Sequence, residues 1–152
     1  MTFADVVFVA YAVLLQGLML ANFGVRLWRP ELERRYGPAL YAFGMTGVVV
    51  AVALTGAGGA WFHSLGPLLY AAWSGWGYWV DVRKRVQWRT NPRSLVFLAY
   101  VGLFMAWQFA FWIPLWTISM AAWIAYAVMY ACSTGLNLAS HRRRPAAPAG
   151  EE

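Results

Sequence analysis

Charged side chains are scarce in this sequence, and their scarcity argues against an ordinary soluble domain. Asp, Glu, Lys and Arg make up 12% of the 152 residues, whereas soluble domains carry about 25%. The apolar residues instead form long uncharged runs, which are typical of a membrane protein. A single cysteine, Cys132, excludes a disulfide within the chain. The length predicts one compact bundle without a second domain.

Patterns of known catalytic or metal-binding sites are also lacking. The sequence contains no recognisable nucleophile–base pair, paired carboxylates or phosphate-binding loop. The glycine-rich segment Gly56–Gly59 follows an apolar helix rather than a strand, which excludes a dinucleotide fingerprint. His63 and His141 fall on opposite sides of the predicted membrane, so they cannot jointly ligate a haem or metal ion. We therefore expect no enzymatic activity, no metal and no cofactor.

Five apolar segments are long enough to cross a bilayer, because about 20 helical residues span roughly 30 Å. The predicted helices cover residues 4–25, 39–60, 67–86, 94–113 and 115–139. The last two divide the uncharged run 94–138 at Pro114, where tryptophans on both sides favour a hairpin at the lipid–water boundary. The sequence thus predicts an all-α integral membrane protein, a bundle of five transmembrane helices. Residues 1–141 form its single membrane domain, and 142–152 a disordered cytoplasmic tail.

The basic residues predict how this bundle is oriented. All twelve Lys and Arg lie in the loops 26–38 and 83–93 and in the C-terminal tail, which five helices place on one side. The positive-inside rule then puts the N-terminus outside and the C-terminus in the cytoplasm of the cell (inner) membrane. A four-helix alternative would leave the arginines of the tail outside. Because topology accounts for the positive charge, we expect the lipid bilayer as a partner and no nucleic acid.

A few polar residues near the predicted membrane segments are candidates for function. Asp81 precedes Arg85 by four residues, which favours an interfacial ion pair over a proton, ion or ligand site. His63 is expected in an outer loop among aromatic residues, either simply exposed or contributing to a site for a flat or cationic ligand. Asn22 and Asn137 are expected at the depth of Asp81, and a small polar pocket results if the three converge.

Two further groups lie inside the predicted helices. Trp73, Trp76 and Trp79 recur every three residues beside glycines, and they predict either a groove for a planar apolar ligand or ordinary packing and anchoring at the interface. Gln16 and Gln108 lie near the middle of the first and fourth helices. Each needs a partner within the bundle, because an unsatisfied amide in hydrocarbon is costly. A hydrogen bond between the two glutamines is one solution.

Small residues form two stripes that predict close helix packing. One stripe contains Gly47, Ala51, Thr55 and Gly59, and the other contains Ala127, Ala131 and Gly135. The contacts can form within the chain, with other membrane subunits or by self-association.

Five helices, abundant tryptophan and an outside N-terminus resemble the general plan of tryptophan-rich sensory proteins. That resemblance implies a binder of porphyrins and related lipids. The family has a Lys-Pro-x-Trp-x-Pro-Pro type signature in its first long loop, whereas this loop reads RLWRPELERRYGP, with one Trp-Arg-Pro and no Pro-Pro pair. The resemblance therefore covers the architecture alone, and no site residue is carried over.

Three functional hypotheses follow. The lack of catalytic patterns and the two small-residue stripes favour an accessory, scaffold or assembly component that acts through helix–helix contacts. The alternative is a binder or sensor of a hydrophobic or planar ligand, porphyrin-like or lipid-like, that uses the groove of Trp73, Trp76 and Trp79. A second alternative is a minimal transporter that uses Asp81.

Overall fold

A computed structural model describes residues 1–84 and 94–142, and their secondary structure is helical apart from the chain start and short turns. They form α1 (Phe3–Trp28), α2 (Pro30–Gly44), α3 (Thr46–Gly56), α4 (Trp61–Gly77), the short π-helix η1 (Tyr78–Arg83), α5 (Leu95–Ile118) and α6 (Met120–Arg142). Apart from Arg142, which ends α6, the predicted tail lies outside the described residues.

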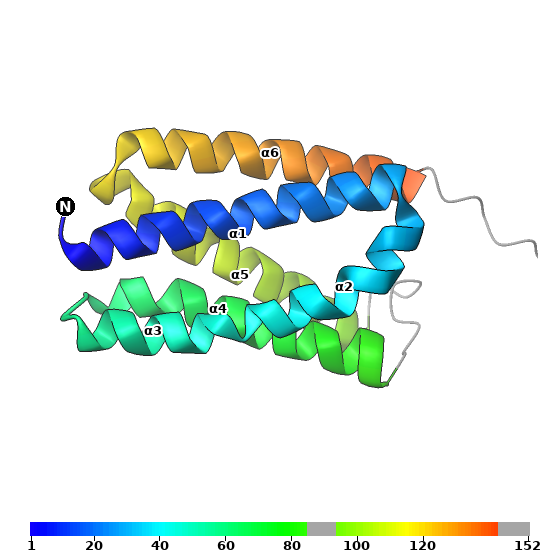
Figure 1. Ribbon diagram of the computed structural model, residues 1–152, viewed down its shortest axis with the longest axis horizontal. Helices are drawn as coiled ribbons and strands as arrows, with labels where there is room; N and C mark the ends of the chain where they lie inside the picture. Colours follow the sequence, from blue (N-terminus) through cyan, green and yellow to red (C-terminus); the bar gives the residue numbers. More distant parts are fainter. Residues whose placement is uncertain (85–93, 143–152) are drawn as a thin grey trace, which may run out of the picture.

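The helices run along one long axis (Figure 1). α1 and α6 lie side by side, α3 and α4 form a second pair, and α5 crosses between the two pairs. The N-terminus and the α3–α4 and α5–α6 turns are at one end of the bundle, which we call the N-terminal end. The α1–α2 corner, η1 and the last turn of α6 are at the other, which we call the basic end because Arg26, Arg29, Arg35, Arg83 and Lys84 lie there.

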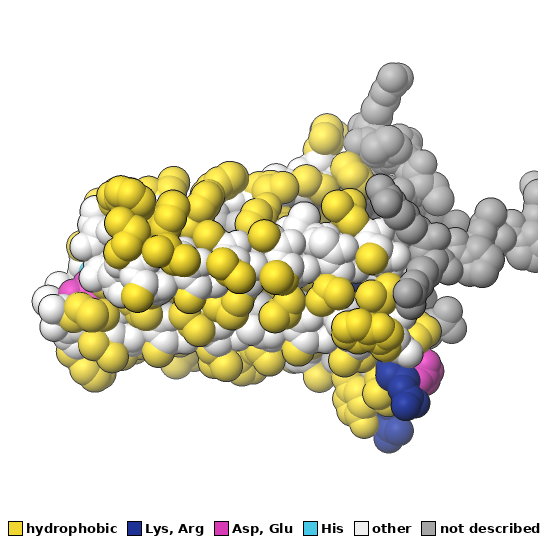
Figure 2. Space-filling model, turned by 90° about the horizontal axis from the view of Figure 1, so that it is seen from above, with side chains coloured by type: hydrophobic (Ala, Val, Ile, Leu, Met, Phe, Trp, Pro, Cys, Tyr) yellow, Lys and Arg dark blue, Asp and Glu magenta, His cyan; other side chains and the backbone are white. Residues whose placement is uncertain are grey.

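Within the described residues, three stretches are long and apolar enough to cross a membrane. They are Phe3–Trp28, Arg35–Gly56 and Leu95–Ile118. Apolar side chains also cover much of the body seen in Figure 2, with charged groups at its ends. Val49 and Ile113, for example, remain 70% and 66% exposed. Because such surfaces are stable in hydrocarbon rather than in water, these helices indicate a membrane protein in contact with the lipid bilayer.

The predicted hairpin at Pro114 is wrong, because α5 continues through this proline to Ile118. The turn lies at Ser119, whose backbone N–H donates to Leu115 O at 2.9 Å. The Ser119 hydroxyl also accepts the backbone N–H of Ala122 at 3.3 Å, which caps the start of α6. Pro114 is tolerated because it removes only one hydrogen bond close to the end of a long helix.

Two other prolines also lie inside helices where the sequence predicted loops or helix starts. Pro38 is inside α2, so the predicted loop 26–38 is mostly helical. The predicted helix 39–60 corresponds to the second half of α2 and to α3, with an interruption at Met45. Pro67 is inside α4, which begins six residues earlier than predicted. Three prolines predicted at helix boundaries therefore lie inside helices in the structure.

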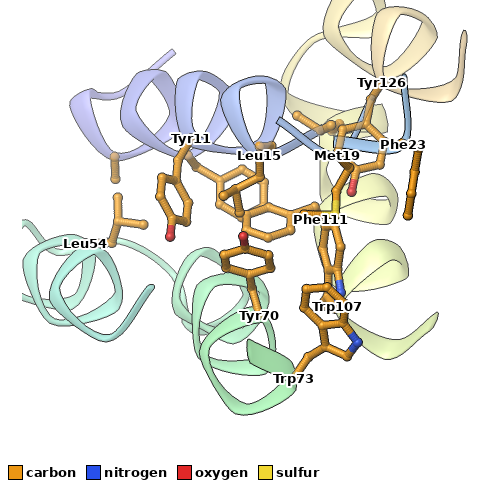
Figure 3. Close-up of a cluster of buried hydrophobic side chains, with 14 residues drawn as sticks. Tyr11, Leu15, Met19, Phe23, Leu54, Tyr70, Trp73, Trp107, Phe111 and Tyr126 are labelled. Atoms are coloured by element: carbon orange, nitrogen blue, oxygen red, sulfur yellow. The ribbon is translucent and has the colours of Figure 1, made fainter. Parts of the chain in front are cut away.

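The core consists mainly of aromatic rings between α1, α4 and α5 (Figure 3). Phe8 contacts Phe111 with ring centroids 5.3 Å apart. Trp107 is fully buried, and its ring centroid lies 5.1 Å from that of Tyr70 and 6.0 Å from that of Trp73. Each such pair contributes about 0.5–1.5 kcal/mol beyond the burial of its area. This cluster holds together the two helix pairs of Figure 1.

The two small-residue stripes have different surroundings. At Gly47 a Cβ would collide with the carbonyl oxygen of Pro67, so the first stripe brings α3 against α4 within the chain. Thr55 and Ser64 join the same two helices through hydroxyls 2.8 Å apart. On α6, in contrast, a Cβ added at Gly135 meets no atom within 4 Å. The second stripe therefore lies on the outside of the bundle.

Candidate functional site

A cavity of about 440 Å³ lies at the basic end, between α1, α2, α4, α5 and α6. Its polar lining consists of Asn22, Arg26, Glu33, Thr134 and Asn137, and its aromatic lining consists of Phe23, Tyr41, Trp73, Phe97, Tyr100, Phe104 and Tyr130. We call it the basic-end cavity. Its volume is within the range of about 300–1,000 Å³ that is typical of small-molecule sites, and its mixture of an apolar wall with a few polar groups is typical of them as well.

Four of the five polar groups reach the cavity from the paired helices α1 and α6, and Glu33 reaches it from α2. Asn22 and Arg26 are four residues apart on α1, and Thr134 and Asn137 are three apart on α6, so each pair shares one helix face. The structure thus brings together Asn22 and Asn137, which the sequence placed at one depth. Their convergence depends on the packing of α1 against α6 and could not be read from either helix alone.

The polar wall contains an ion pair between Arg26 and Glu33. Glu33 Oε1 accepts from Arg26 Nη2 at 2.8 Å and from Nε at 3.2 Å, and both side chains are only about one-sixth exposed. Arg26 Nη1 also donates to Asn137 Oδ1 at 3.4 Å. Sequence reasoning assigned Arg26 to topology alone and did not single out Glu33. The two meet because the chain turns at Arg29, between α1 and α2.

Asp81 lies behind the aromatic wall, in η1. The Tyr41 hydroxyl donates to Asp81 Oδ2 at 2.7 Å and lies 3.5 Å from the Tyr100 hydroxyl. Hydrogen bonds to a charged acceptor are among the stronger ones, so this contact ties α2 to η1. The predicted partner Arg85 lies outside the described residues. Asp81 is therefore connected to the cavity through Tyr41, which the sequence analysis did not identify.

The three tryptophans of the predicted groove do not line one common surface. Trp73 is 6% exposed and lines the cavity. Trp79 is 44% exposed, and its ring is 5.4 Å from that of Trp76, which does not line the cavity. A step of three residues falls about 60° short of a full helical turn, so two steps move the side chain by about 120° around the helix. Of the predicted groove, only Trp73 belongs to the site.

His63 is buried in α4 at the N-terminal end, and its expected position in an exposed outer loop is wrong. Its Nε2 lies 2.9 Å from Asp5 Oδ1, while its ring packs edge-on against Phe8 at 5.3 Å. Asp5 also accepts the backbone N–H of Thr2, in a capping box at the start of α1. The difference arises because α4 begins at Trp61 and so includes the histidine. The contact joins α1 to α4, far from the basic-end cavity (Figure 1).

The two buried glutamines bond to α6 rather than to each other. Gln16 Nε2 donates to Ser133 Oγ at 3.1 Å, and the Tyr126 hydroxyl donates to Gln108 Oε1 at 2.6 Å. Within the described residues, Gln16 Oε1 and Gln108 Nε2 have no hydrogen-bond partner. The glutamines thus help to hold α1 and α5 against α6.

The part of the chain that the structure describes contains no group of three or more His, Cys, Asp and Glu residues placed to hold a metal ion. Comparison of the chain with protein-family models, with curated proteins and with solved structures finds no match. The fold and the cavity therefore define a class, a helical membrane protein with several candidate spans, and a function has to be argued from the cavity itself.

Proposed function

We propose that this chain is a five-span membrane protein that binds a small amphipathic or planar ligand in the basic-end cavity. The observation that carries the proposal is the cavity itself, which is lined by aromatic rings, mainly from α2, α4 and α5, and by polar groups, mainly from α1 and α6. Such a lining suits a ligand that has both a flat or apolar body and a polar group. The site also lies at the end of the bundle where a lipid-soluble molecule would meet polar headgroups.

The arrangement of the helix ends supports five spans with the N-terminus outside. The described basic residues cluster at the end opposite the N-terminus, and α6 ends there as well (Figure 1). The positive-inside rule places this end in the cytoplasm. A reporter fused to the C-terminus tests this topology: green fluorescent protein should fluoresce there, and alkaline phosphatase should be inactive. The reverse pattern would contradict the proposed orientation.

Ligand binding is tested by filling the cavity. Gly37 lines it, and a Cβ added there meets no atom within 4 Å, so Gly37→Leu adds volume at the cavity without an initial clash. Gly102→Leu is the matched control, because Gly102 has equally open surroundings on α5 but does not line the cavity. We expect the protein extracted gently from its native membrane to retain a small molecule in native mass spectrometry. Gly37→Leu should lose this molecule, and Gly102→Leu should keep it.

The proposal fails if Gly37→Leu retains the same molecule in the same amount as the wild type. It also fails if the wild type neither retains a small molecule nor binds an added planar compound with a dependence on Gly37.

An accessory or assembly role is the second candidate, and the outward stripe on α6 favours it. Ala131 and Gly135 are exposed, which leaves a surface that another helix could approach closely. Gly135→Leu should abolish crosslinking to a partner subunit or a second copy without changing the fold. Gly17→Leu on α1 is the control, since a Cβ at Gly17 also meets nothing within 4 Å. Equal crosslinking in both variants would remove this candidate.

Transport through Asp81 remains a third hypothesis, which rests on the connection of this acid to the cavity wall through Tyr41. It requires the carboxyl group to change its charge during turnover. Full flux in an Asp81→Asn variant reconstituted in vesicles would exclude it.

A further inference from the structure

The lining of the basic-end cavity also indicates the chemistry of its ligand. Resting on the proposed function, we infer that the cavity binds an uncharged planar ring that bears a hydroxyl or carbonyl oxygen, and that Asn22 and Thr134 bind this oxygen. It rests on the pairing of the charged groups, on two polar groups without a partner among the described residues, and on the aromatic rings of the lining.

The charged groups of the lining are already paired. Glu33 Oε1 accepts two hydrogen bonds from Arg26, and Asn137 accepts a third. A ligand with one carboxylate would have to displace Glu33 from Arg26 and leave that carboxylate without its partner in a largely buried site. A ligand with one positive charge would compete with Arg26 for Glu33 in the same way. Since removing one partner of a buried pair is costly, the site favours an uncharged ligand.

Two polar side chains of the lining have no hydrogen-bond partner among the described residues. They are the side-chain amide of Asn22 and the hydroxyl of Thr134, and both side chains are half-buried in the cavity wall. An amide and a hydroxyl each both donate and accept, so together they can satisfy a hydroxyl or a carbonyl oxygen. A ligand oxygen that bonds to both groups would gain the free energy of these hydrogen bonds.

The aromatic part of the lining consists of rings packed against one another. Trp73 lies 5.4 Å from Tyr100, 5.7 Å from Phe104 and 6.0 Å from Tyr41, measured between ring centroids. Aromatic faces and edges of this kind favour contact with a flat ring over a bulky aliphatic body. Acid-bearing tetrapyrroles carry carboxylates that the paired charges of Arg26 and Glu33 disfavour, so we expect a neutral planar ligand.

Three probes with the same ring separate the contributions of ring contact, of hydrogen bonding to an oxygen and of ligand charge. They are naphthalene, 2-naphthol and 2-naphthoate. Their affinities are measured by equilibrium dialysis against the full chain in nanodiscs, with empty nanodiscs subtracted. For each probe the variant is compared with the wild type, so partition into lipid cancels. Asn22→Leu should weaken 2-naphthol binding about 2- to 10-fold, the value of one hydrogen bond, and leave naphthalene binding unchanged. Thr134→Val, which keeps the side-chain volume, should act in the same direction.

A third variant tests the role of the ion pair. Glu33→Gln removes the charge that neutralises Arg26, so it should strengthen 2-naphthoate binding by about 10-fold or more while changing naphthalene little. The inference is overturned if Asn22→Leu and Thr134→Val affect naphthalene and 2-naphthol equally, or if wild-type protein prefers 2-naphthoate. Loss of naphthalene binding in Gly37→Leu but not in Gly102→Leu would uphold the proposed function in that case. If neither glycine variant changes the binding of any probe, the proposed function fails as well.

Discussion

The contact between α3 and α4 at Gly47 makes the sharpest stability prediction. In the variant Gly47→Ala, the added methyl group would overlap the carbonyl oxygen of Pro67 and lie 3.3 Å from Ala71 Cβ. The carbonyl belongs to the backbone of α4 and cannot rotate away, so the two helices have to move apart. Overpacking of this kind costs about 1–3 kcal/mol. Separation of the helices would also weaken the hydrogen bond between Thr55 and Ser64.

A control separates this packing cost from the better helix propensity of alanine, which is worth up to about 1 kcal/mol. Gly102→Ala obtains the propensity gain alone, because a Cβ at Gly102 meets nothing within 4 Å. The free energy of unfolding, measured by titration with SDS in mixed micelles and followed by tryptophan fluorescence, should therefore be about 1–3 kcal/mol lower for Gly47→Ala than for Gly102→Ala. Values that agree within about 0.5 kcal/mol would refute the close contact of α3 with α4.

Three further predictions concern single contacts elsewhere in the bundle. Tyr126→Phe removes the 2.6 Å hydrogen bond to Gln108 and leaves a buried amide without it; we expect unfolding to become easier by about 1–3 kcal/mol, and an unchanged value would contradict this bond. His63→Leu should raise hydrogen exchange at the start of α1, because Asp5 loses its contact with α4; wild-type protection there would argue against the pair. Gly58→Ala should lower the unfolding temperature, because Gly58 has a φ of 74°, which alanine adopts only with strain.

The helix boundaries show which features of the fold can be predicted from short segments of the sequence. The sequence correctly predicts helices, since the length of an apolar run is a local property that the thickness of the bilayer selects. It misplaces the turn after α5, because Pro114 is the stronger local signal and Ser119 acts only through hydrogen bonds on both of its sides. The sequence predicts His63 in a loop for a similar reason, because Pro67 is a strong local signal for the start of a helix, whereas α4 begins at Trp61.

In the candidate site, some residues can be predicted from the sequence and others are placed only by tertiary packing. Trp73, Asn22 and Asn137 were identified from sequence, because polar or aromatic residues in an apolar helix stand out. Glu33 and Tyr41 were not, since neither is unusual at its place in the sequence. They belong to the site because the chain turns between α1 and α2 and brings α2 across the basic end, where they contact Arg26 and Asp81.

The sequence alone therefore determined the class of this protein, a helical membrane protein, and predicted its orientation from the positions of its arginines and lysines. Both depend on the composition of single segments of the chain. The apolar length of a segment decides whether it crosses the bilayer, and the positive charge of the loops decides the orientation. Only the tertiary structure decided which stripe of small residues is used inside the bundle, which tryptophan faces inward, and where a cavity remains. These features depend on how far one helix is rotated and displaced against another, and helix faces that look equivalent in the sequence become different once they are packed.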